Sequence, residues 1–338
     1  MADSETINVV VATNFSDVII NRLREVSPRL HVERAHPTVA EKTWANVDIL
    51  FTTHIFPKPE QAPNLRWIQL YSAGINHAIN EPILSADNVE VTTASGIHAT
   101  PMSEFSLAMM LAFTYKLPKI LEFQGQAHWE PDRDSIFAPI PLRGRTLGIV
   151  GYGSIGRELA RAADALGMTV LATKRDVMHP ADEEAYHEPG TGDPEGEIPV
   201  RLYPSQAVGS MARECDFLVV TAPLTDDTRH MIDAAVLKQM KKTAVIVNVA
   251  RGAVIDEAAL VEALQARKIG GAALDVFEQE PLPADSPLWK LDNVILSSHI
   301  SGNFVTYDES AAALFKENLE HYLENRPLIN RVQRERGY

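Results

Sequence analysis

The sequence has a single cysteine among its 338 residues, and this scarcity limits what the protein can be. One thiol cannot form an internal disulfide, so the chain fits a reducing compartment rather than the disulfide framework of small secreted domains. Cys215 lies in the run Glu-Cys-Asp-Phe-Leu-Val-Val at the start of a predicted strand. We therefore expect a buried, unreactive thiol there, not a nucleophile.

Long apolar runs and a leader sequence are also missing. No apolar run reaches the length that crosses a membrane, and Met1-Ala-Asp-Ser-Glu lacks a basic region followed by an apolar one. These two absences predict a cytoplasmic protein.

A surplus of positive charge is the third absence. The 31 Lys and Arg residues face 45 Asp and Glu residues, which gives a formal net charge of -14. A chain this acidic has no spare cations for a nucleic-acid backbone, so nucleic acid is not an expected partner. The 11 histidines are scattered without ligand spacing, so no metal site is predicted.

What is present is the content of an ordinary globular protein. Hydrophobic residues make up 45% of the chain and charged residues 22%, and the length suits about two domains. Such a chain can bury two sizeable cores.

The chain is organised around the motif Gly151-Tyr-Gly-Ser-Ile-Gly156. The run Thr146–Val150 before it predicts a buried strand, and residues Arg157 to Leu166 after it predict a helix that ends at Gly167. In that setting Gly151 permits a tight turn, Gly153 lets a pyrophosphate approach the backbone, and Gly156 lets the helix pack on the strand. The pattern therefore predicts a dinucleotide site at the positive end of a helix.

Strands alternate with helices or loops on both sides of this motif, which predicts two parallel α/β units. The candidate strands of the first unit are 7–12, 30–33, 48–52, 65–71 and 89–93. Those of the second are 146–150, 169–173, 200–203, 217–221, 244–249, 271–274 and 294–297. The second unit should be a doubly wound Rossmann sheet, and the first a smaller flavodoxin-like parallel α/β domain.

The expected helices open with Ser or Asp caps at Ser16, Ser205, Asp233 and Asp256. Residues 304–324 form a last helix candidate with no strand partner in the second unit, so we expect it to return to the first. This predicts a discontinuous substrate domain, 1–100 and 303–338, around a dinucleotide-binding domain, 101–302. The chain then ends in a basic stretch from Arg331, which should be exposed.

Two segments do not fit a regular alternation. Residues 101–115 form a strongly apolar helix candidate with Pro101 at its first position, which we expect to be buried between the domains. Residues 176–199 hold eight acidic residues, four prolines and three glycines, so they predict a solvated excursion near the adenosine end of the cofactor.

Six spaced blocks resemble the D-isomer-specific 2-hydroxyacid dehydrogenases, and the resemblance covers nearly the whole chain. The blocks are Tyr71-Ser-Ala-Gly-Ile75, Gly151-Tyr-Gly-Ser-Ile-Gly156, Pro223-Leu-Thr-Asp-Asp-Thr228, Asn248-Val-Ala-Arg-Gly252, Asp275-Val-Phe-Glu-Gln-Glu-Pro281 and Ser298-His-Ile-Ser-Gly302. The resemblance, closest in character to glyoxylate and hydroxypyruvate reductases, implies hydride transfer between a nicotinamide cofactor and a small 2-oxo or 2-hydroxy acid.

The resemblance implies three catalytic residues. Arg251, at the carboxyl edge of the sheet, would clamp the substrate carboxylate and polarise its carbonyl; a surface salt bridge is the alternative. His299 would be the general acid in reduction, with Glu280 favouring its protonated form, and the alternative is a histidine that caps a strand end. Glu278 competes for the acid role but matches no family position. Formate dehydrogenases, which are similar, carry Gln where Glu280 stands.

The resemblance also implies a substrate loop and a set of cofactor contacts. The backbone amides of Ala73, Gly74 and Ile75 would hold the substrate carboxylate, with Tyr71 shaping the pocket; a plain turn is the alternative. The implied cofactor contacts beyond the three glycines are Ser154, Ile155, Pro223, Thr228, Val249, Ala250, Asp275 for the carboxamide, Gly302 and Met102. Met102 could equally be simple core.

One position departs from the pattern of NAD-using members. Those members place an acid at the end of the second strand of the nucleotide-binding sheet, about twenty residues after the glycines, to bind the ribose 2′-hydroxyl. Here Lys174 and Arg175 stand there, and two cations suit a 2′-phosphate, so NADP(H) is predicted over NAD(H). The alternative is that both cations face solvent and Asp176 or the acidic excursion serves the ribose.

The sequence thus predicts a cytoplasmic homodimer that reduces 2-oxo acids with NADP(H). Trp129 lies in a region that reaches a neighbouring subunit in this family. His54 and His98 lie near the predicted cleft but are expected to be structural. Two other functions stay open: a nucleotide-sensing corepressor or scaffold, because such relatives can keep the same residues, and a phosphite-type dehydrogenase.

Overall fold

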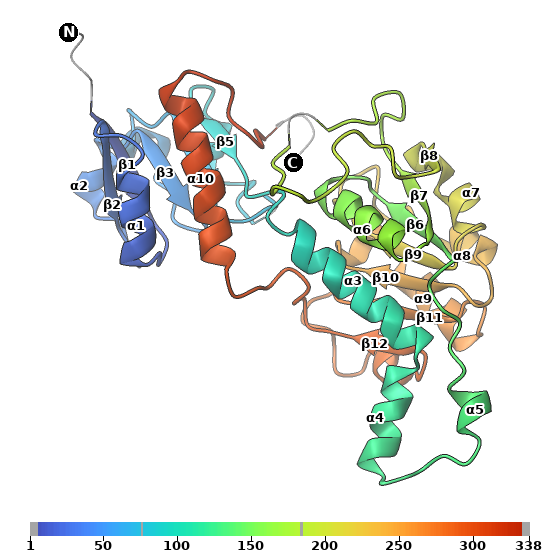
Figure 1. The fold of residues 1–338 in the computed structure, drawn as a ribbon. Helices are drawn as coiled ribbons and strands as arrows, with labels where there is room; N and C mark the ends of the chain where they lie inside the picture. Colours follow the sequence, from blue (N-terminus) through green and yellow to red (C-terminus); the bar gives the residue numbers. More distant parts are fainter. Residues whose placement is uncertain (1–5, 76, 183–184, 333–338) are drawn as a thin grey trace. The chain divides into compact units, whose positions relative to one another are not determined.

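The computed structural model describes residues 6–75, 77–182 and 185–332, and its contacts divide them into two units (Figure 1). Unit 1 contains the chain up to Ile97, residues 185–187, and the chain from Phe304 onward. Unit 2 contains His98–Asp182 and Glu188–Asn303. The chain therefore passes between the units after Ile97 and after Asn303, and within the acidic excursion it enters unit 1 and returns to unit 2.

Unit 1 is built on a five-stranded parallel sheet of order β2-β1-β3-β4-β5. Its strands are β1 (Ile7–Val11), β2 (Leu30–Arg34), β3 (Ile49–Thr52), β4 (Trp67–Leu70) and β5 (Glu90–Thr92). Its α-helices are α1 (Asp17–Arg24), α2 (Glu41–Trp44) and α10 (Tyr307–Leu323), with short 3-10 turns at Pro59–Gln61 and Pro82–Ser85.

Each face of this sheet has its own apolar core, because alternate side chains of a strand point to opposite faces. Val9 and Phe51 pack in one cluster with α1 and with Leu314, Phe315 and Leu319 of α10. The opposite cluster holds side chains such as Val10, Leu50 and Ile68 together with Trp44 of α2. The last long helix of the chain is thus part of the unit 1 core.

Unit 2 is built on a seven-stranded parallel sheet of order β12-β11-β10-β9-β6-β7-β8. Its strands are β6 (Thr146–Val150), β7 (Thr169–Thr173), β8 (Arg201–Tyr203), β9 (Phe217–Val220), β10 (Val245–Asn248), β11 (Gly271–Leu274) and β12 (Val294–Leu296). The strand order reverses between β6 and β9, so a crevice opens there at the carboxyl edge, where open α/β sheets bind ligands. The expected doubly wound sheet is confirmed.

Helices cover both faces of the unit 2 sheet. The helices are α3 (Ala99–Thr114), α4 (Leu117–Gly125), α5 (Arg133–Ile136), α6 (Ser154–Ala165), α7 (Val208–Ala212), α8 (Ala234–Gln239) and α9 (Glu257–Gln265), with 3-10 turns at Ser205–Ala207, Gly252–Val254 and Pro287–Lys290. Apolar side chains of α3 and α6 share one core with the sheet, and those of α7, α8 and α9 share the other. In Figure 1, α4 and α5 extend away from this sheet.

The helix ends follow the local rules, with two corrections. Ser16, Asp233 and Asp256 cap their helices with side-chain oxygens, as expected. Ser205 does not cap: it lies inside a 3-10 turn that follows Pro204. Pro101 is the third residue of α3 rather than the first, because the helix begins at Ala99.

Helix α6 ends in a Schellman arrangement centred on Gly167, whose φ of 77° lies in the left-handed region. The Gly167 amide donates to the Asp164 carbonyl at 2.7 Å, and the Met168 amide donates to the Ala163 carbonyl at 3.1 Å. These two bonds satisfy carbonyls that the helix leaves open, so the predicted glycine cap is confirmed.

Other expectations are settled by burial. Cys215 is fully buried, and burial raises the pKa of its thiol to about 12, so it is inert at neutral pH. The apolar helix α3 packs inside the unit 2 core through Met102 and Met110, while Leu111 is exposed. Arg331, the first residue of the basic stretch, is exposed and its backbone forms an antiparallel bridge with Thr92. Residues 333–338 of this stretch lie outside the described residues. None of the described helices is long and apolar enough to span a membrane.

Candidate functional site

The three glycines of the 151–156 motif have three different surroundings. A Cβ on Gly151, whose φ is 101°, would lie 2.7 Å from the backbone of Ala222, and one on Gly156 would lie 2.5 Å from the Gly151 carbonyl oxygen. A Cβ on Gly153 would meet nothing within 4 Å. Packing therefore requires the first and third glycines, whereas no described residue requires a glycine at the second position.

That open space lies at the start of α6. Gly153 is the residue before the helix, and no side chain caps it. The first-turn amides, including those of Ser154 and Ile155, and the positive end of the helix dipole can therefore serve a pyrophosphate. These residues fit a dinucleotide, and the sequence assigned them to one.

Replacing Gly153 with alanine should weaken cofactor binding without harming the fold. The added methyl group would project into the open space where a pyrophosphate is predicted to bind, which at an overpacking cost of about 1–3 kcal/mol means a Kd roughly 5- to 150-fold higher. The φ of −98° at this position suits alanine, so the melting temperature should hold. Fluorescence titration with NADPH measures the Kd. Gly125→Ala, at another glycine with no neighbour within 4 Å of its Cβ, is the control, and equal Kd values for the two variants would contradict this assignment.

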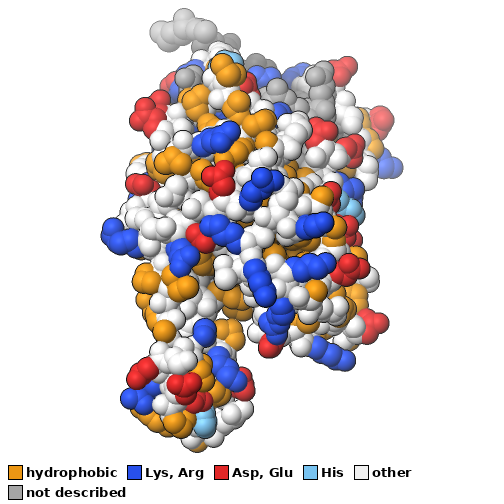
Figure 2. Space-filling view, turned by 90° about the vertical axis from the view of Figure 1, so that its right-hand side faces the viewer, with side chains coloured by type: hydrophobic (Ala, Val, Ile, Leu, Met, Phe, Trp, Pro, Cys, Tyr) orange, Lys and Arg blue, Asp and Glu red, His pale blue; other side chains and the backbone are white. Residues whose placement is uncertain are grey.

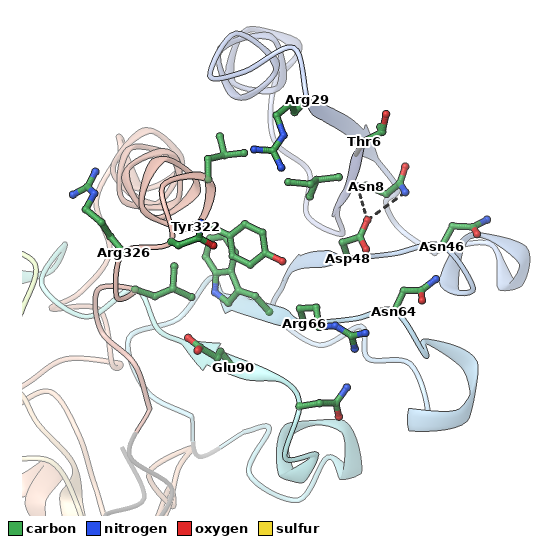
Figure 3. Close-up of a pocket in the computed structure, with 16 residues that line it drawn as sticks. Thr6, Asn8, Arg29, Asn46, Asp48, Asn64, Arg66, Glu90, Tyr322 and Arg326 are labelled. Carbon is green, nitrogen blue, oxygen red and sulfur yellow. Dashed lines mark hydrogen bonds between the residues drawn. The ribbon is translucent and has the colours of Figure 1, made fainter. Parts of the chain in front are cut away.

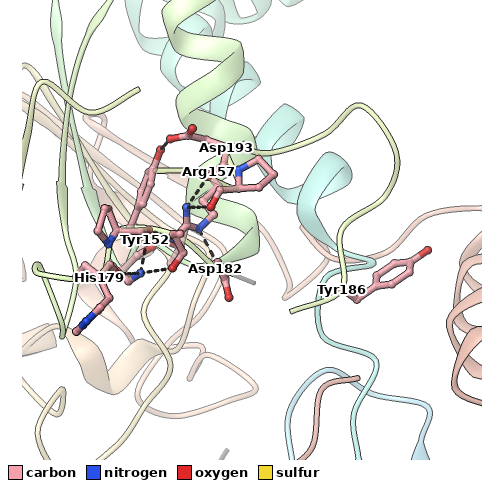
Figure 4. Close-up of polar contacts among 12 residues, drawn as sticks. Tyr152, Arg157, His179, Asp182, Tyr186 and Asp193 are labelled. Carbon is pink, nitrogen blue, oxygen red and sulfur yellow. Dashed lines mark hydrogen bonds and ion pairs between the residues drawn. The ribbon is translucent and has the colours of Figure 1, made fainter. Parts of the chain in front are cut away.

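The acidic excursion 176–199 is only partly solvated: Met178 and Glu195 are exposed, as expected, but other parts of the segment bond to α6. It contains no helix or strand among its described residues. Arg157 of α6 is fully buried and donates to the carbonyls of Asp193 at 2.5 Å and Pro180 at 2.6 Å (Figure 4). The Cζ atom of Arg157 lies 4.7 Å from the centre of the Tyr152 ring. The Tyr152 hydroxyl donates to the Asp193 carboxylate at 2.5 Å. A buried arginine thus gathers both ends of the segment.

Lys174 has a different environment from the one predicted. Its ammonium donates to the carbonyls of His179, Pro180 and Ala181, at 2.5, 2.9 and 2.9 Å. Burial and then the nearby Arg157 charge lower its pKa. Lys174 therefore holds the excursion in place, and Arg175, exposed just after β7, is the more accessible of the two cations for a phosphate.

Arg251 follows β10 at the carboxyl edge of the sheet. Asn248 at the end of that strand donates through its side-chain amide to the Arg251 carbonyl at 3.1 Å, which fixes the backbone of the turn. The guanidinium donates to the Ala250 carbonyl at 2.7 Å, and no carboxylate in the described part of the chain pairs with it. The alternative of a surface salt bridge therefore finds no support, and the positive charge is available for an anionic ligand.

His299 and Glu280 are in direct contact. The Nδ1 atom of His299 lies 2.8 Å from Oε2 of Glu280, and the other carboxylate oxygen accepts the Phe277 amide at 3.0 Å. Because a carboxylate only accepts, Nδ1 carries a proton and Nε2 is the atom that can exchange one with a ligand. Glu278, the competitor, is engaged elsewhere: it pairs with His230 at 2.8 Å and accepts the Glu257 amide at 3.2 Å.

Asp275 holds the loop that carries His299. Its buried carboxylate accepts the Ser297 hydroxyl at 2.6 Å and the amides of Ile300 and Ser301 at 2.9 and 2.8 Å. Burial favours the neutral acid, but the bonds from Ser297 and Ser301 outweigh it and leave the pKa of Asp275 below its ordinary value. This anchoring role was not predicted; the sequence assigned Asp275 only to the carboxamide.

His98 is a site residue that the sequence analysis set aside. It precedes α3, and its ring lies so close to Gly302 that a Cβ there would be 3.1 Å from Cδ2. Burial, and next the charge of Arg251, lower the pKa of His98 to about 4. A second, neutral imidazole therefore lies within electrostatic reach of Arg251. The only signal in the sequence was its place directly before an apolar helix.

His98 should make stability depend on pH. Between pH 6.5 and about 4 the unfolded chain binds a proton here that the folded chain refuses, so the free energy of unfolding falls as pH falls. From pH 6.5 to 5 the loss is about 2 kcal/mol, since one pH unit corresponds to about 1.4 kcal/mol. Urea unfolding at the two pH values measures it. In His98→Gln the free energy of unfolding should lack this part of its fall with pH. Identical pH dependence in the variant and the unaltered protein would contradict this role of His98.

The remaining predicted cofactor residues of unit 2 lie around the same edge. Thr228 closes its turn by donating to the Pro223 carbonyl at 2.6 Å. Val249 and Ala250 are buried after β10, and Met102 is buried in the α3 core close to Gly302. Among the described residues no three His, Cys, Asp or Glu side chains gather in a group that could hold a metal ion.

The predicted substrate residues of unit 1 follow β4. Tyr71 donates to Asp308 at 2.7 Å and lies against Tyr307, so its ring belongs to the unit 1 core. Burial and then this bond to Asp308 raise its pKa. Within the described residues, nothing accepts a hydrogen bond from the amides of Ala73, Gly74 or Ile75. These amides are therefore available to an anion.

Comparison with known proteins agrees with this geometry. Residues 107–301 match the family described as D-isomer specific 2-hydroxyacid dehydrogenase, NAD binding domain. A glyoxylate reductase from Thermofilum pendens is 34% identical over 261 residues, 77% of this chain and 72% of the relative. A family protein from Aeromonas salmonicida matches in structure with a TM-score of 0.76 at 30% identity, over 98% of this chain and 100% of the other.

A third relative is a family dehydrogenase from Xanthobacter autotrophicus Py2, solved in complex with NADPH and MES. It has a TM-score of 0.77 at 25% identity, over 99% of this chain and 100% of that one. The chain therefore belongs to the D-isomer specific 2-hydroxyacid dehydrogenase family. It is an NAD(P)-dependent D-2-hydroxyacid dehydrogenase, an oxidoreductase that acts on small 2-oxo or 2-hydroxy acids.

Proposed function

We propose that the protein is an NADP(H)-preferring reductase of small 2-oxo acids in which Arg251, His299 and Glu280 carry the chemistry. The observation that supports this most directly is the 2.8 Å contact between His299 Nδ1 and Glu280 Oε2. Unit 2 would be the dinucleotide-binding domain, and unit 1 the substrate domain, with the amides of residues 73–75 offered to the substrate carboxylate.

Each residue has a separate task in the proposed reduction. Arg251 binds the substrate carboxylate and draws electron density from the adjacent carbonyl, because its guanidinium has no carboxylate partner in the described chain. A nicotinamide cofactor, held by the amides at the start of α6, would supply the hydride that C2 receives. His299 gives the carbonyl oxygen a proton from Nε2, and the product is the 2-hydroxy acid. Glu280 keeps the imidazole in the tautomer and orientation that this step needs.

The substrate is tested by initial rates of NADPH loss with glyoxylate, hydroxypyruvate, pyruvate and a branched 2-oxo acid. Turnover of at least one of these acids is the expected result. Relatives named glyoxylate reductase make glyoxylate the first choice. Binding of NADPH without turnover of any of them would instead favour a nucleotide sensor.

The preference for NADP(H) is supported by Arg175, which is exposed just after β7. It is also supported by the two basic residues at positions 174 and 175, where NAD-using members have an acidic residue. The Xanthobacter relative was solved with NADPH. Running the same rates with NADH in parallel tests the preference. Arg175→Gln should raise the KM for NADPH and leave that for NADH unchanged, whereas faster turnover with NADH in the unaltered enzyme would contradict the proposal.

A homodimer is supported by the apolar surface of the arm formed by residues 115–141. Leu117, Ile120 and Leu121 of α4 are exposed, and Trp129 and Ile140 are 81% and 60% exposed. Figure 2 shows hydrophobic side chains gathered on the lobe at the lower end of the view. Apolar side chains exposed together mark protein interfaces.

Trp129→Asp combined with Leu121→Asp should convert the dimer to a monomer in light scattering. Met178→Asp, at an 80% exposed apolar residue outside the arm, should leave the mass unchanged. A monomeric unaltered protein would contradict the proposal.

A further inference from the structure

Unit 1 has a cavity at the edge of its sheet opposite to the predicted substrate loop. Its volume is about 860 Å³, within the range of small-molecule sites. Asn8 lies in β1, Asp48 and Arg66 directly precede β3 and β4, and Glu90 begins β5, so all four stand at the amino ends of parallel strands (Figure 3). Residues 73–75 follow the carboxyl end of β4. Within unit 1, the cavity therefore lies at the other edge of the sheet from residues 73–75.

One wall of the cavity is a pair of aromatic rings. Tyr322, at the end of α10, stacks on Trp67 with ring centres 5.7 Å apart and planes 21° apart. Trp67 is fully buried and its indole nitrogen donates to Thr92 at 2.8 Å, so it gives Tyr322 a fixed support. Burial is the main cause that raises the pKa of Tyr322, and the charges of four groups around the cavity, Asp48, Arg66, Glu90 and Arg29, also act on it.

The two carboxylates that line the cavity are already engaged. Oδ2 of Asp48 accepts the backbone and side-chain amides of Asn8, at 2.8 and 3.3 Å. Glu90 pairs with Arg331 at 3.5 Å. The charge of Glu90 is thus partly offset by Arg331, and Asp48 has one of its oxygens occupied by neutral amides.

Two of the three arginines of the cavity are not neutralised. Arg326 donates to Glu324 at 2.7 Å and points away in Figure 3. Arg29 has no ion pair within the described residues, and its buried Nε atom finds no acceptor there. Arg66 donates only to the carbonyls of Pro63 and Leu65 in the same part of the chain. In a chain of net charge -14, this cavity thus has two guanidinium groups that form no ion pair within the described residues.

Side-chain amides complete the lining. Three exposed asparagines line the cavity: Asn46, Asn88 and Asn325. Their side-chain amides make no hydrogen bond with any other described residue. An amide both donates and accepts, which matches the dual character of a sugar hydroxyl. The cavity thus joins cationic, amide and aromatic surfaces.

From this lining we propose that the cavity is a binding site for a small polyhydroxylated organic anion, a sugar phosphate or a sugar acid. The anionic group binds Arg29 or Arg66, the hydroxyls bind the asparagine side-chain amides, and the carbon skeleton lies against Tyr322. This site is independent of the proposed reductase chemistry, because its residues belong to the amino edge of the unit 1 sheet.

Calorimetric titration of the full-length protein with ribose 5-phosphate and with gluconate tests the proposal. One equivalent of at least one of them should bind, and inorganic phosphate or ribose alone should bind at least tenfold more weakly. Arg29→Gln with Arg66→Gln should weaken binding at least tenfold. Arg22→Gln, at an exposed arginine of α1 outside the cavity, should not change it.

Three results would overturn the proposal. The first is that neither compound binds. The second is that phosphate alone binds as tightly as ribose 5-phosphate. The third is that Arg251→Lys abolishes binding while the Arg29 and Arg66 double variant retains it, which would place the anion at Arg251. Melting temperatures of the variants show that each is folded. The titration contains no 2-oxo acid, so its outcome does not depend on whether the proposed reduction occurs.

Discussion

Replacing His299 with alanine is expected to lower kcat for 2-oxo acid reduction by about 10²- to 10⁴-fold, the range that a positioned general acid contributes. His299 is the residue whose Nε2 atom can deliver a proton, because Nδ1 is held by Glu280 at 2.8 Å. The cofactor residues Gly151, Gly153 and Gly156 belong to a different loop, so the Kd for NADPH should stay within about a factor of two of the original value, a small change in binding free energy.

A matched variant separates proton transfer from structure. Glu280→Gln keeps the shape of the side chain, but an amide can donate to Nδ1 and so select the wrong tautomer of His299. Its kcat should fall by about 10²-fold or more, by analogy with losses when the orienting acid of a histidine is replaced. Full activity in His299→Ala, with NADPH bound normally, would remove His299 from the mechanism.

The second large effect is expected at Arg251. Arg251→Lys keeps the charge but loses the planar fork that grips a carboxylate through two bonds, so kcat/KM should fall by about 10²-fold, or roughly 3 kcal/mol. The loss should appear in the KM for the 2-oxo acid and in kcat, since the guanidinium both binds the carboxylate and polarises the carbonyl. The KM for NADPH should change little.

Arg213→Gln is the control for this loss of charge, because Arg213 is exposed and its guanidinium donates to Gln239, a neutral side chain. It should retain full activity. If Arg251→Lys reduces 2-oxo acids as well as the unaltered enzyme, the arginine does not bind the substrate.

Much of the fold could be predicted because its signals are local. Buried parallel strands are typically short apolar runs bounded by turns, and most of the strands in the described residues are such runs. The edge strands β2 and β8 are more polar, but each also overlaps a predicted strand. The motif from Gly151 to Gly156 required only neighbouring residues, and the cap at Gly167 followed from a glycine after an apolar helix. Ser205 was mistaken for a cap because Pro204 starts the turn one residue earlier.

The excursion could not be predicted in the same way. Arg157 looks like a surface residue of an amphipathic helix, yet it is fully buried by carbonyls from Pro180 and Asp193, more than twenty residues away. Such contacts leave no periodic pattern in the sequence. The same segment binds Lys174, and this changes how the cation pair can act on a cofactor.

In the candidate site, Arg251, Glu280 and His299 were identified from the sequence through its resemblance to the family, and their roles remain predictions. It did not indicate how the loop with His299 is held. That function falls to Asp275, whose hydrogen bonds reach residues 22 to 26 positions further along the chain. His98 was also undervalued, because its closeness to Gly302 and Arg251 arises only from the fold.

The most direct test of the central claim is isotope transfer. The protein is incubated with pyruvate, or the best 2-oxo acid of the panel, and NADPH that carries deuterium at the transferable position of the nicotinamide. The account predicts a D-2-hydroxy acid with one deuterium at C2, formed by the unaltered enzyme and lost in His299→Ala. An L-product, a product without deuterium at C2, or bound NADPH with no product from any 2-oxo acid would contradict it.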